Sequence, residues 1–147
     1  MWGTHRVSIL GASAQLTSCD FRGNVASAGG AVSLYGYVGG IGSKLTNKVR
    51  SKLIIHRGGS SPTMFTSNLA KTNGRSAFAK GGALYIGGTS LYDSSSATSQ
   101  QLGHSKAVVF QQNKAQSGGA VFVTASGEGF FGNTMFENNT AERHQQG

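Results

Sequence analysis

One stretch decides the fold: Phe110-Gln-Gln-Asn113-Lys-Ala115-Gln-Ser-Gly118-Gly119-Ala120, which has the pattern F-x-x-N-x-A-x-x-G-G-A. The first half of this pattern occurs four times, starting at Phe21, Phe65, Phe110 and Phe136. The double glycine follows in the first three copies, as Gly29-Gly30, Gly81-Gly82 and Gly118-Gly119. By chance about 0.05 copies of F-x-x-N-x-A would be expected, so the pattern is a true internal repeat.

Each position of the repeat has a physical role. Phenylalanine is an apolar anchor at the end of a strand. We expect Asn24 and its equivalents at a turn, because asparagine tolerates left-handed backbone and bonds neighbouring main chain. The double glycine allows a second sharp turn. The strand that follows in the first copy, residues 31–35, alternates, which predicts Val32 and Leu34 inside and Ser33 outside.

A circuit of about 20 to 26 residues is too short to bury its own apolar face, so repeats of this kind are stable only when stacked. Stacking at about 4.8 Å pairs each strand with its copy in the next circuit. Phenylalanine then lies over phenylalanine, and asparagine over asparagine in a hydrogen-bonded ladder. We therefore expect an all-β chain that forms a right-handed parallel β-helix, a pectin-lyase-like solenoid of about four circuits with loop inserts.

One domain, residues 1–147, is expected from the length. The fourth copy stops before its glycines, and His144-Gln-Gln-Gly147 stands in their place. This truncated repeat indicates a fragment of a longer solenoid, whose neighbouring repeats would be natural partners.

Three segments lie outside the repeat. Residues 7–16 read as a strand with a turn at Gly11. Residues 44–56 fit a strand with Val49, Leu53 and Ile55 on one side, and they fit a short helix equally well. Residues 89–101 are rich in Ser and Thr and read as a loop. Tyr92→Ala in this loop is therefore expected to cost under about 1 kcal/mol, against about 3 to 5 kcal/mol for Phe110→Ala.

The composition favours an exported β protein. There are 23 glycines and one proline, and only 12% of the residues are charged. Such a glycine content without a collagen period indicates many tight turns. Cys19 is the only cysteine, which leaves no intrachain disulfide. No apolar run is long enough for a transmembrane helix, and the Val7–Leu10 segment is too short for a clear signal peptide.

The net charge of +8 points to acidic partners. Five cations gather in one segment of the chain, namely Lys44, Lys48, Arg50, Lys52 and Arg57. A solvated loop face explains them, and so does a surface that binds sulfated or uronic glycans or other acidic polymers. Tyr35 and Tyr37 nearby could stack on a sugar ring. The sequence gives no sign of specific nucleic-acid binding.

Polysaccharide lyases and hydrolases, which also use β-helices, need clustered carboxylates. This chain has five Asp and Glu residues: Asp20, Asp93, Glu128, Glu137 and Glu142. Asp20 and Glu137 flank the first and the last repeat phenylalanine, which places them about 15 Å apart on stacked circuits. The four histidines share no metal-ligand spacing. We therefore expect no catalytic residues, no metal and no cofactor.

The repeat F-x-x-N-x-A followed by G-G-A-[VL] resembles that of the chlamydial polymorphic outer membrane proteins. The copies that carry the resemblance run from Phe21 to Val32, Phe65 to Leu84, Phe110 to Val121 and Phe136 to Ala141. The resemblance implies a right-handed parallel β-helix exposed on a cell surface, often with an adhesive role. The chain departs from the family because it shows no C-terminal membrane barrel and no clear secretion signal.

The leading hypothesis is a non-catalytic, extracellular or cell-surface module of the adhesion type that displays loops on a β-helix. The alternative is a carbohydrate- or polyanion-binding β-helix fragment that uses the basic segment 44–57, with polysaccharide degradation as its less favoured form.

Overall fold

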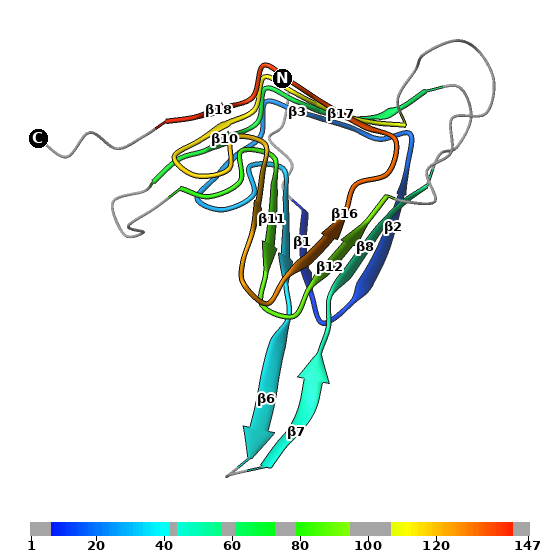
Figure 1. Cartoon of the computed structure of the whole chain (residues 1–147), viewed down its shortest axis with the longest axis vertical. Helices are drawn as coiled ribbons and strands as arrows, with labels where there is room; N and C mark the ends of the chain where they lie inside the picture. The colour runs from blue at the N-terminus through cyan, green and yellow to red at the C-terminus, as the bar shows by residue number, and fades with distance from the viewer. Residues whose placement is uncertain (1–6, 42–43, 57–60, 73–78, 95–106, 143–147) are drawn as a thin grey trace, which may run out of the picture.

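The computed structural model describes residues 7–41, 44–56, 61–72, 79–94 and 107–142, and between residues 37 and 49 it describes the backbone alone. Within these residues the chain is all β and contains no helix, which confirms the expected class. Sixteen of its strands lie in four parallel sheets of four strands each, and two form a separate hairpin. Three of the four parallel sheets, called A, B and C below, form the three sides of a triangular outline (Figure 1).

Apart from β1 and β2, which precede the first copy of the repeat, the strands of sheets A and B come from the part of the chain that follows a double glycine. Sheet A consists of β1 (Val7–Leu10), β5 (Val32–Tyr35), β11 (Leu84–Gly87) and β15 (Val121–Val123). Sheet B consists of β2 (Ser13–Thr17), β8 (Lys52–His56), β12 (Leu91–Asp93) and β16 (Glu128–Phe130).

Sheets C and D carry the F-x-x-N-x-A half of the repeat. Sheet C consists of β3 (Asp20–Arg22), β9 (Thr63–Thr66), β13 (Val108–Gln111) and β17 (Thr134–Glu137). Sheet D consists of the short strands β4 (Val25–Ala26), β10 (Leu69–Ala70), β14 (Lys114–Ala115) and β18 (Thr140–Ala141).

The chain visits the four sheets in the same order four times, and each visit makes one layer. Layer one holds β1 to β4, layer two holds β5 and β8 to β10, layer three holds β11 to β14, and layer four holds β15 to β18. Every strand pairs in parallel with its counterpart in the adjacent layer. Each repeat therefore obtains its backbone partners from its neighbours.

The four repeat phenylalanines form one column inside the stack. Their ring centroids are 5.0 Å apart between Phe21 and Phe65, 4.7 Å between Phe65 and Phe110, and 5.0 Å between Phe110 and Phe136, with nearly parallel planes. Phe65 and Phe110, in the middle, are fully buried. The predicted stacking of like residues is confirmed.

The four repeat asparagines form a hydrogen-bonded ladder. The backbone N–H and the Nδ2 of Asn24 both donate to Oδ1 of Asn68. Asn68 donates in the same way to Asn113, and Asn113 to Asn139. The ladder satisfies polar groups that would be costly to bury alone.

The left-handed residue of this turn is the one before the asparagine, so the expected backbone of Asn24 was wrong. Positive φ occurs at Gly23 (64°), Ser67 (55°), Gln112 (54°) and Asn138 (51°). The asparagine itself must aim its amide along the stack at the adjacent layers. The residue before it therefore reverses the chain.

The alternation predicted in residues 31–35 is correct for the core. Val32 and Leu34 are fully buried, as are Leu84 and Ile86 in the next layer. Ser33 is buried as well, although it occupies the outward position between them. Its Oγ donates to the carbonyl of Ala28, and the Gly29 turn folds over it.

Residues 44–56 are strand throughout their regular part, in two pieces. β7 (Lys44–Val49) pairs antiparallel with β6 (Tyr37–Ile41), and this hairpin projects from the stack (Figure 1). β8 then enters sheet B with Leu53 and Ile55 fully buried, as the strand alternative predicts.

The loop predicted over residues 89–101 was wrong in its described part. Leu91–Asp93 is β12 in the middle of sheet B. Tyr92 is fully buried, with its ring 4.8 Å from that of Phe131 and 6.5 Å from that of Phe110. The small loss expected for Tyr92→Ala is therefore wrong, because this side chain is part of the core.

Candidate functional site

The structure divides the predicted basic segment between two elements. Lys44 and Lys48 lie on β7 of the projecting hairpin, where they pair with Ile41 and Val38 across the ladder. Lys52 lies on β8 in sheet B, between Ser13 of layer one and Leu91 of layer three. Arg57 lies outside the described residues.

Arg50 is already engaged by an acidic partner. It stands between the hairpin and β8, and its guanidinium forms an ion pair with Glu128 of layer four. Both side chains are about half exposed, 43% and 54%. A polyanion that used Arg50 would have to compete with this carboxylate.

The cations therefore do not alternate along one strand of the stack. Lys44 and Lys48 lie on the hairpin, Arg50 precedes β8, and Lys52 is the first residue of β8. We call these four positions the hairpin surface.

Sheet A carries an external aromatic column that the sequence analysis did not assign. Tyr35 and Tyr85 have ring centroids 5.2 Å apart, and Tyr85 and Phe122 are 6.0 Å apart. Lys80 Nζ lies 4.9 Å from the centre of the Phe122 ring. Gly87 makes room for the Tyr85 ring, since an added Cβ would lie 2.4 Å from it. The signal was present, because Tyr85 and Phe122 occupy the same repeat position.

The rings of this column pack on one another. The Tyr85 and Phe122 rings are stacked with an interplanar angle of 2°, so they turn faces toward each other rather than toward solvent. Burial, and to a smaller extent the neighbouring Tyr35, raises the pKa of Tyr85. The ring of Tyr35 packs against that of Tyr85 at an interplanar angle of 38°, and Tyr37 belongs to β6, of which only the backbone is described.

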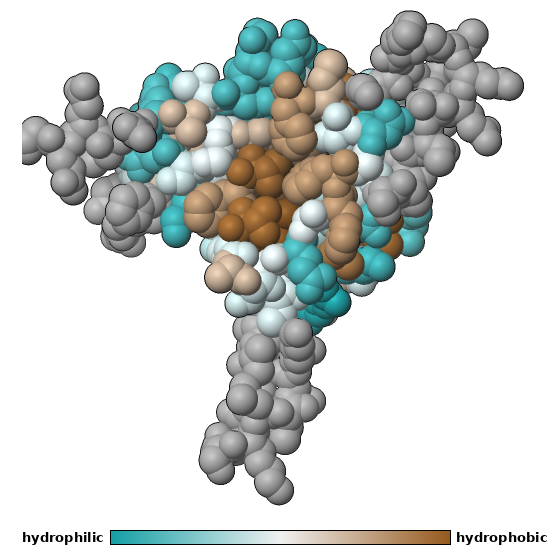
Figure 2. Space-filling view, viewed as in Figure 1, coloured by the Kyte–Doolittle hydropathy of each residue, from teal (hydrophilic) through white to brown (hydrophobic). Residues whose placement is uncertain are grey.

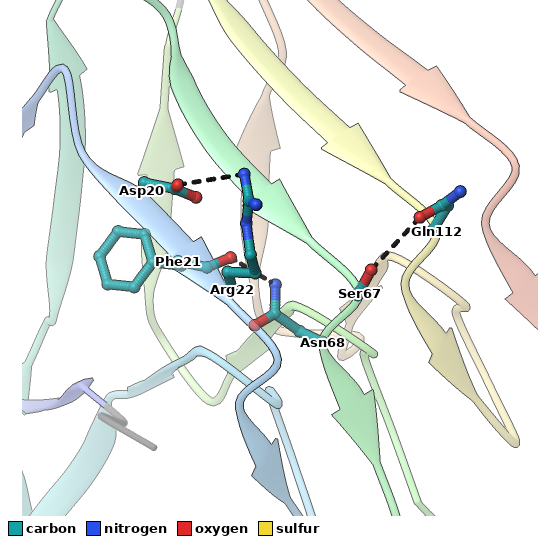
Figure 3. Close-up of polar contacts among 6 residues, drawn as sticks. All are labelled: Asp20, Phe21, Arg22, Ser67, Asn68 and Gln112. Atoms are coloured by element: carbon teal, nitrogen blue, oxygen red, sulfur yellow. Dashed lines mark hydrogen bonds and ion pairs between the residues drawn. The ribbon is translucent and has the colours of Figure 1, made fainter. Parts of the chain in front are cut away.

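Several polar contacts lie on and beside the outer face of sheet C. Arg22 forms an ion pair with Asp20 at 3.4 Å, and Ser67 Oγ donates to Oε1 of Gln112 at 3.3 Å (Figure 3). Just inside this face, Nδ2 of Asn68 donates to the carbonyl of Phe21 at 2.9 Å (Figure 3). One of these contacts lies within layer one, and the other two join neighbouring layers.

The acidic side chains are scattered and have partners. Glu142 pairs with Lys114, and Glu137 accepts a hydrogen bond from Gln111 at 3.1 Å. Asp20 and Glu128 pair with arginines. Among the described residues there is no group of three His, Cys, Asp or Glu side chains able to hold a metal ion.

Tyr92 is the most strongly perturbed titratable group of the described chain. Desolvation raises the pKa of its phenol far above the ordinary value of 10.0; the neighbouring Ser94 side chain has a smaller lowering effect, and the charge of Asp93 has a smaller raising effect. Its hydroxyl makes no hydrogen bond in the described structure. The hydroxyl of Ser94 lies within hydrogen-bond distance of the carbonyls of Phe130 and Gly132 and of the hydroxyl of Thr134. A phenol enclosed in the core has no access to substrate, so this shift concerns stability.

The end of the stack at layer four exposes an apolar face. Figure 2 shows apolar side chains gathered in the middle of the triangular outline, where the strands of layer four lie toward the reader. Phe130 and Met135 of layer four are exposed, but they occupy outward positions on sheets B and C. The end of the stack itself exposes three large apolar residues by about a third or more: Val123, Phe131 and Phe136. We call this the layer-four face.

In comparisons with known proteins, no protein-family model, no curated protein and no solved structure matches the chain. No helix in the described part of the chain is long and apolar enough to cross a membrane.

Proposed function

We propose that this chain is a right-handed parallel β-helix of the pectin-lyase-like type that serves as a non-catalytic, cell-surface or extracellular module of the adhesion type. Its stacked repeats are the scaffold, and its inserts are the interacting parts. The resemblance of F-x-x-N-x-A and G-G-A to the chlamydial polymorphic outer membrane protein repeat supports this proposal. Right-handed crossovers between parallel strands are the strongly favoured form.

One observation carries the proposal: the stack keeps its register across an insertion. Tyr35, before the hairpin, pairs with Gly87, and Lys52, after it, pairs with Ser13. Ser51 Oγ donates to the carbonyl of Tyr35 and accepts from the N–H of Gly11, which ties the two ends of the insert together. A scaffold of this kind can carry a surface loop without changing its core, as functional loops on rigid scaffolds do.

The placement of the carboxylates favours a non-catalytic role. Acid–base chemistry on a glycosidic bond needs two carboxyl groups on either side of one substrate position. Here Asp20 faces Arg22, Glu128 faces Arg50, and Glu142 faces Lys114. These side chains stabilise one another as ion pairs on the outside of the stack.

Binding to acidic polymers through the hairpin surface is the most concrete form of the function. We expect the native chain to be retained on heparin or polygalacturonate and to elute at a lower salt concentration when Lys48, Arg50 and Lys52 are changed to Ala. The matched control changes Arg22, Lys80 and Lys114 to Ala, which removes the same charge elsewhere. If the elution salt concentration falls equally in the two triple variants, the binding depends on net charge alone and cannot be assigned to the hairpin surface.

The enzymatic alternative is tested on the same polymer. A polysaccharide lyase lowers the viscosity of polygalacturonate and creates an unsaturated, ultraviolet-absorbing product, whereas a hydrolase lowers the viscosity without that absorbance. We expect neither change with purified chain. Loss of viscosity that scales with protein concentration would overturn the non-catalytic proposal.

A further inference from the structure

The asparagine ladder has a direction, and this gives the stack two different ends. In each step the earlier asparagine donates its backbone N–H and Nδ2 to Oδ1 of the later one. The later asparagine returns one Nδ2 hydrogen bond to the carbonyl of the earlier repeat phenylalanine, as Asn139 does to Phe110 at 2.8 Å. Every step uses the same three hydrogen bonds.

The ladder groups at the two ends are complementary. In the earlier layers, the asparagine N–H donates to the next asparagine and the phenylalanine carbonyl accepts from it. In layer four, the equivalent groups are the N–H of Asn139 and the carbonyl of Phe136. In layer one, Oδ1 of Asn24 holds the acceptor position. Asn24 and Ile9 are only 4% and 6% exposed, so whatever covers this end in the free chain has to move aside when a second copy binds. Within the described part of the chain no side chain completes these positions. An asparagine placed as Asn24 is placed would complete the layer-four end.

The strand registers extend this match to the whole face. If layer one of a second copy followed layer four in the same register, like apolar residues would meet. The pairs would be Val121 with Val7, Val123 with Ile9, Phe136 with Phe21, and Ala141 with Ala26. Phe136 is 50% exposed and stacks on one side only, against Phe110. Phe21 would cover its other side.

The outer position next to the phenylalanine column brings opposite charges together. Glu137 is in register with Gln111, Thr66 and Arg22 through the three layers before it. In the continued stack, Glu137 of one copy would therefore lie opposite Arg22 of the next. Opposite charges facing each other across adjacent strands stabilise the pairing.

We propose that the layer-four face binds layer one of a second copy of this chain, so that copies stack head to tail with the sheets continuous across the junction. The interface joins two different surfaces by a repeated step, which makes it heterologous and open-ended. Chains therefore grow into short filaments as the concentration rises. This goes beyond the proposed surface function, because it concerns how modules join rather than what their loops bind.

Phe136→Glu tests the proposal against a matched control, Phe130→Glu. The two phenylalanines are similarly exposed, 50% and 54%, but Phe130 occupies an outward position on sheet B, in register with Asp93. Sedimentation velocity on the whole chain over a wide concentration range should show growing oligomers for the native chain and for Phe130→Glu. Phe136→Glu should remain monomeric at the same concentrations, with native circular dichroism.

A charge exchange tests the register without touching the core. Glu137→Arg and Arg22→Glu each put like charges at the junction, so each variant alone should associate about fivefold more weakly than the native chain. In an equal mixture every junction between unlike variants contains one arginine and one glutamate. The mixture should therefore recover native association. This pair remains informative if Phe136→Glu unfolds.

Several results would overturn the proposal. A native chain that stays monomeric at every concentration would do so, as would equal effects of the two phenylalanine variants. Failure of the charge-exchange mixture to recover would rule out the head-to-tail register. A chain that remains monomeric yet binds a separate polypeptide bearing the F-x-x-N-x-A repeat would show that the face serves another repeat and not a second copy.

Discussion

At the scale of single residues, each repeat position acts on its equivalents rather than on its sequence neighbours. Phe110 is covered by Phe65 on one side and Phe136 on the other. Asn113 accepts from Asn68 and donates to Asn139. The same side chain is therefore worth different amounts in different layers, and the middle of the stack contributes most.

Phe110→Ala should cost about 3 to 5 kcal/mol of unfolding free energy, because it empties a fully buried site between two rings. Phe136→Ala should cost about 1 to 2 kcal/mol, since half of that side chain is already in water. Chemical denaturation of the two variants measures the difference. Equal losses would contradict a column in which position along the stack sets the contribution.

Two substitutions of Tyr92 should separate the contribution of its ring from that of its hydroxyl. Tyr92→Ala should cost about 3 to 5 kcal/mol, as for other buried aromatic residues. Tyr92→Phe should be neutral or gain up to about 1 kcal/mol, because the hydroxyl is buried without a partner.

The raised pKa of Tyr92 sets the sign of the pH effect. Its folded pKa lies above the unfolded value of 10.0, so the stabilising neutral phenol is fully present below pH 10. This stability is lost as the pH rises from there toward the folded pKa. Denaturation of the native chain should therefore become easier above pH 10, and Tyr92→Phe should lack that part of the loss. Parallel pH curves for the two proteins would contradict the assignment.

At the scale of elements, the double-glycine turns are points of close approach between layers. A Cβ on Gly82 would lie 1.9 Å from the carbonyl oxygen of Gly119 and 2.6 Å from the N–H nitrogen of Lys114. Both contacts are with backbone, which cannot move away without opening the layers. The second glycine of each pair is thus required by close approach between layers.

Gly82→Ala should therefore destabilise the chain by at least about 3 kcal/mol. The matched control is Gly23→Ala, where φ is +64° and nothing lies within 4 Å of the added Cβ. That change should cost only about 1 to 2 kcal/mol, the penalty for left-handed backbone. Thermal unfolding of both variants distinguishes crowding from backbone strain, and a larger loss at Gly23 would contradict this reading.

The hairpin of β6 and β7 should be dispensable for folding. Layer three makes the same connection, from β11 to β12, with the short turn Gly88-Thr89-Ser90. Replacing residues 36–51 with this turn should change the unfolding free energy by no more than about 1 kcal/mol, since closure entropy depends only weakly on loop length. Urea denaturation measures it, and an unfolded product would show that the hairpin supports the stack.

The sequence predicted sheets C and A, because their strands carry the repeated residues. It missed β12 and β16 of sheet B, whose strands share no motif: Leu91-Tyr-Asp stands opposite Glu128-Gly-Phe. The strand β12 was also hidden by the Ser and Thr residues around it. Pairing with neighbouring layers, rather than local preference, makes these residues strands.

The candidate site was less predictable than the fold. The sequence gathered the basic residues correctly along the chain, but it could not show that a hairpin separates Lys44 and Lys48 from Lys52. It could not show the Arg50–Glu128 pair either, because these residues meet only through the stacking of layers two to four. Contacts across layers depend on register, which the inserts obscure.

At the scale of the whole molecule, one geometric rule explains the core, the ladders and the exposed end. Each layer has an apolar interior that only another layer can cover. Inner layers are covered on both sides, and layer four leaves an aromatic face in water. An exposed apolar end of this kind favours association with another chain. The loops that project from the sides of the stack are free for a different role.

The most direct test of the stack is a disulfide ladder on the outside of sheet C, in a chain with Cys19→Ser. Arg22, Thr66 and Gln111 occupy one register position in layers one, two and three. Adjacent strands lie about 4.8 Å apart, within the Cα separation of about 4.4 to 6.8 Å that a disulfide spans. Arg22→Cys with Thr66→Cys, and Thr66→Cys with Gln111→Cys, should each oxidise to an intramolecular disulfide in the native state. Arg22→Cys with Gln111→Cys should not, because a layer lies between them. Efficient cross-linking of that third pair, or none in the first two, would contradict the stacked arrangement.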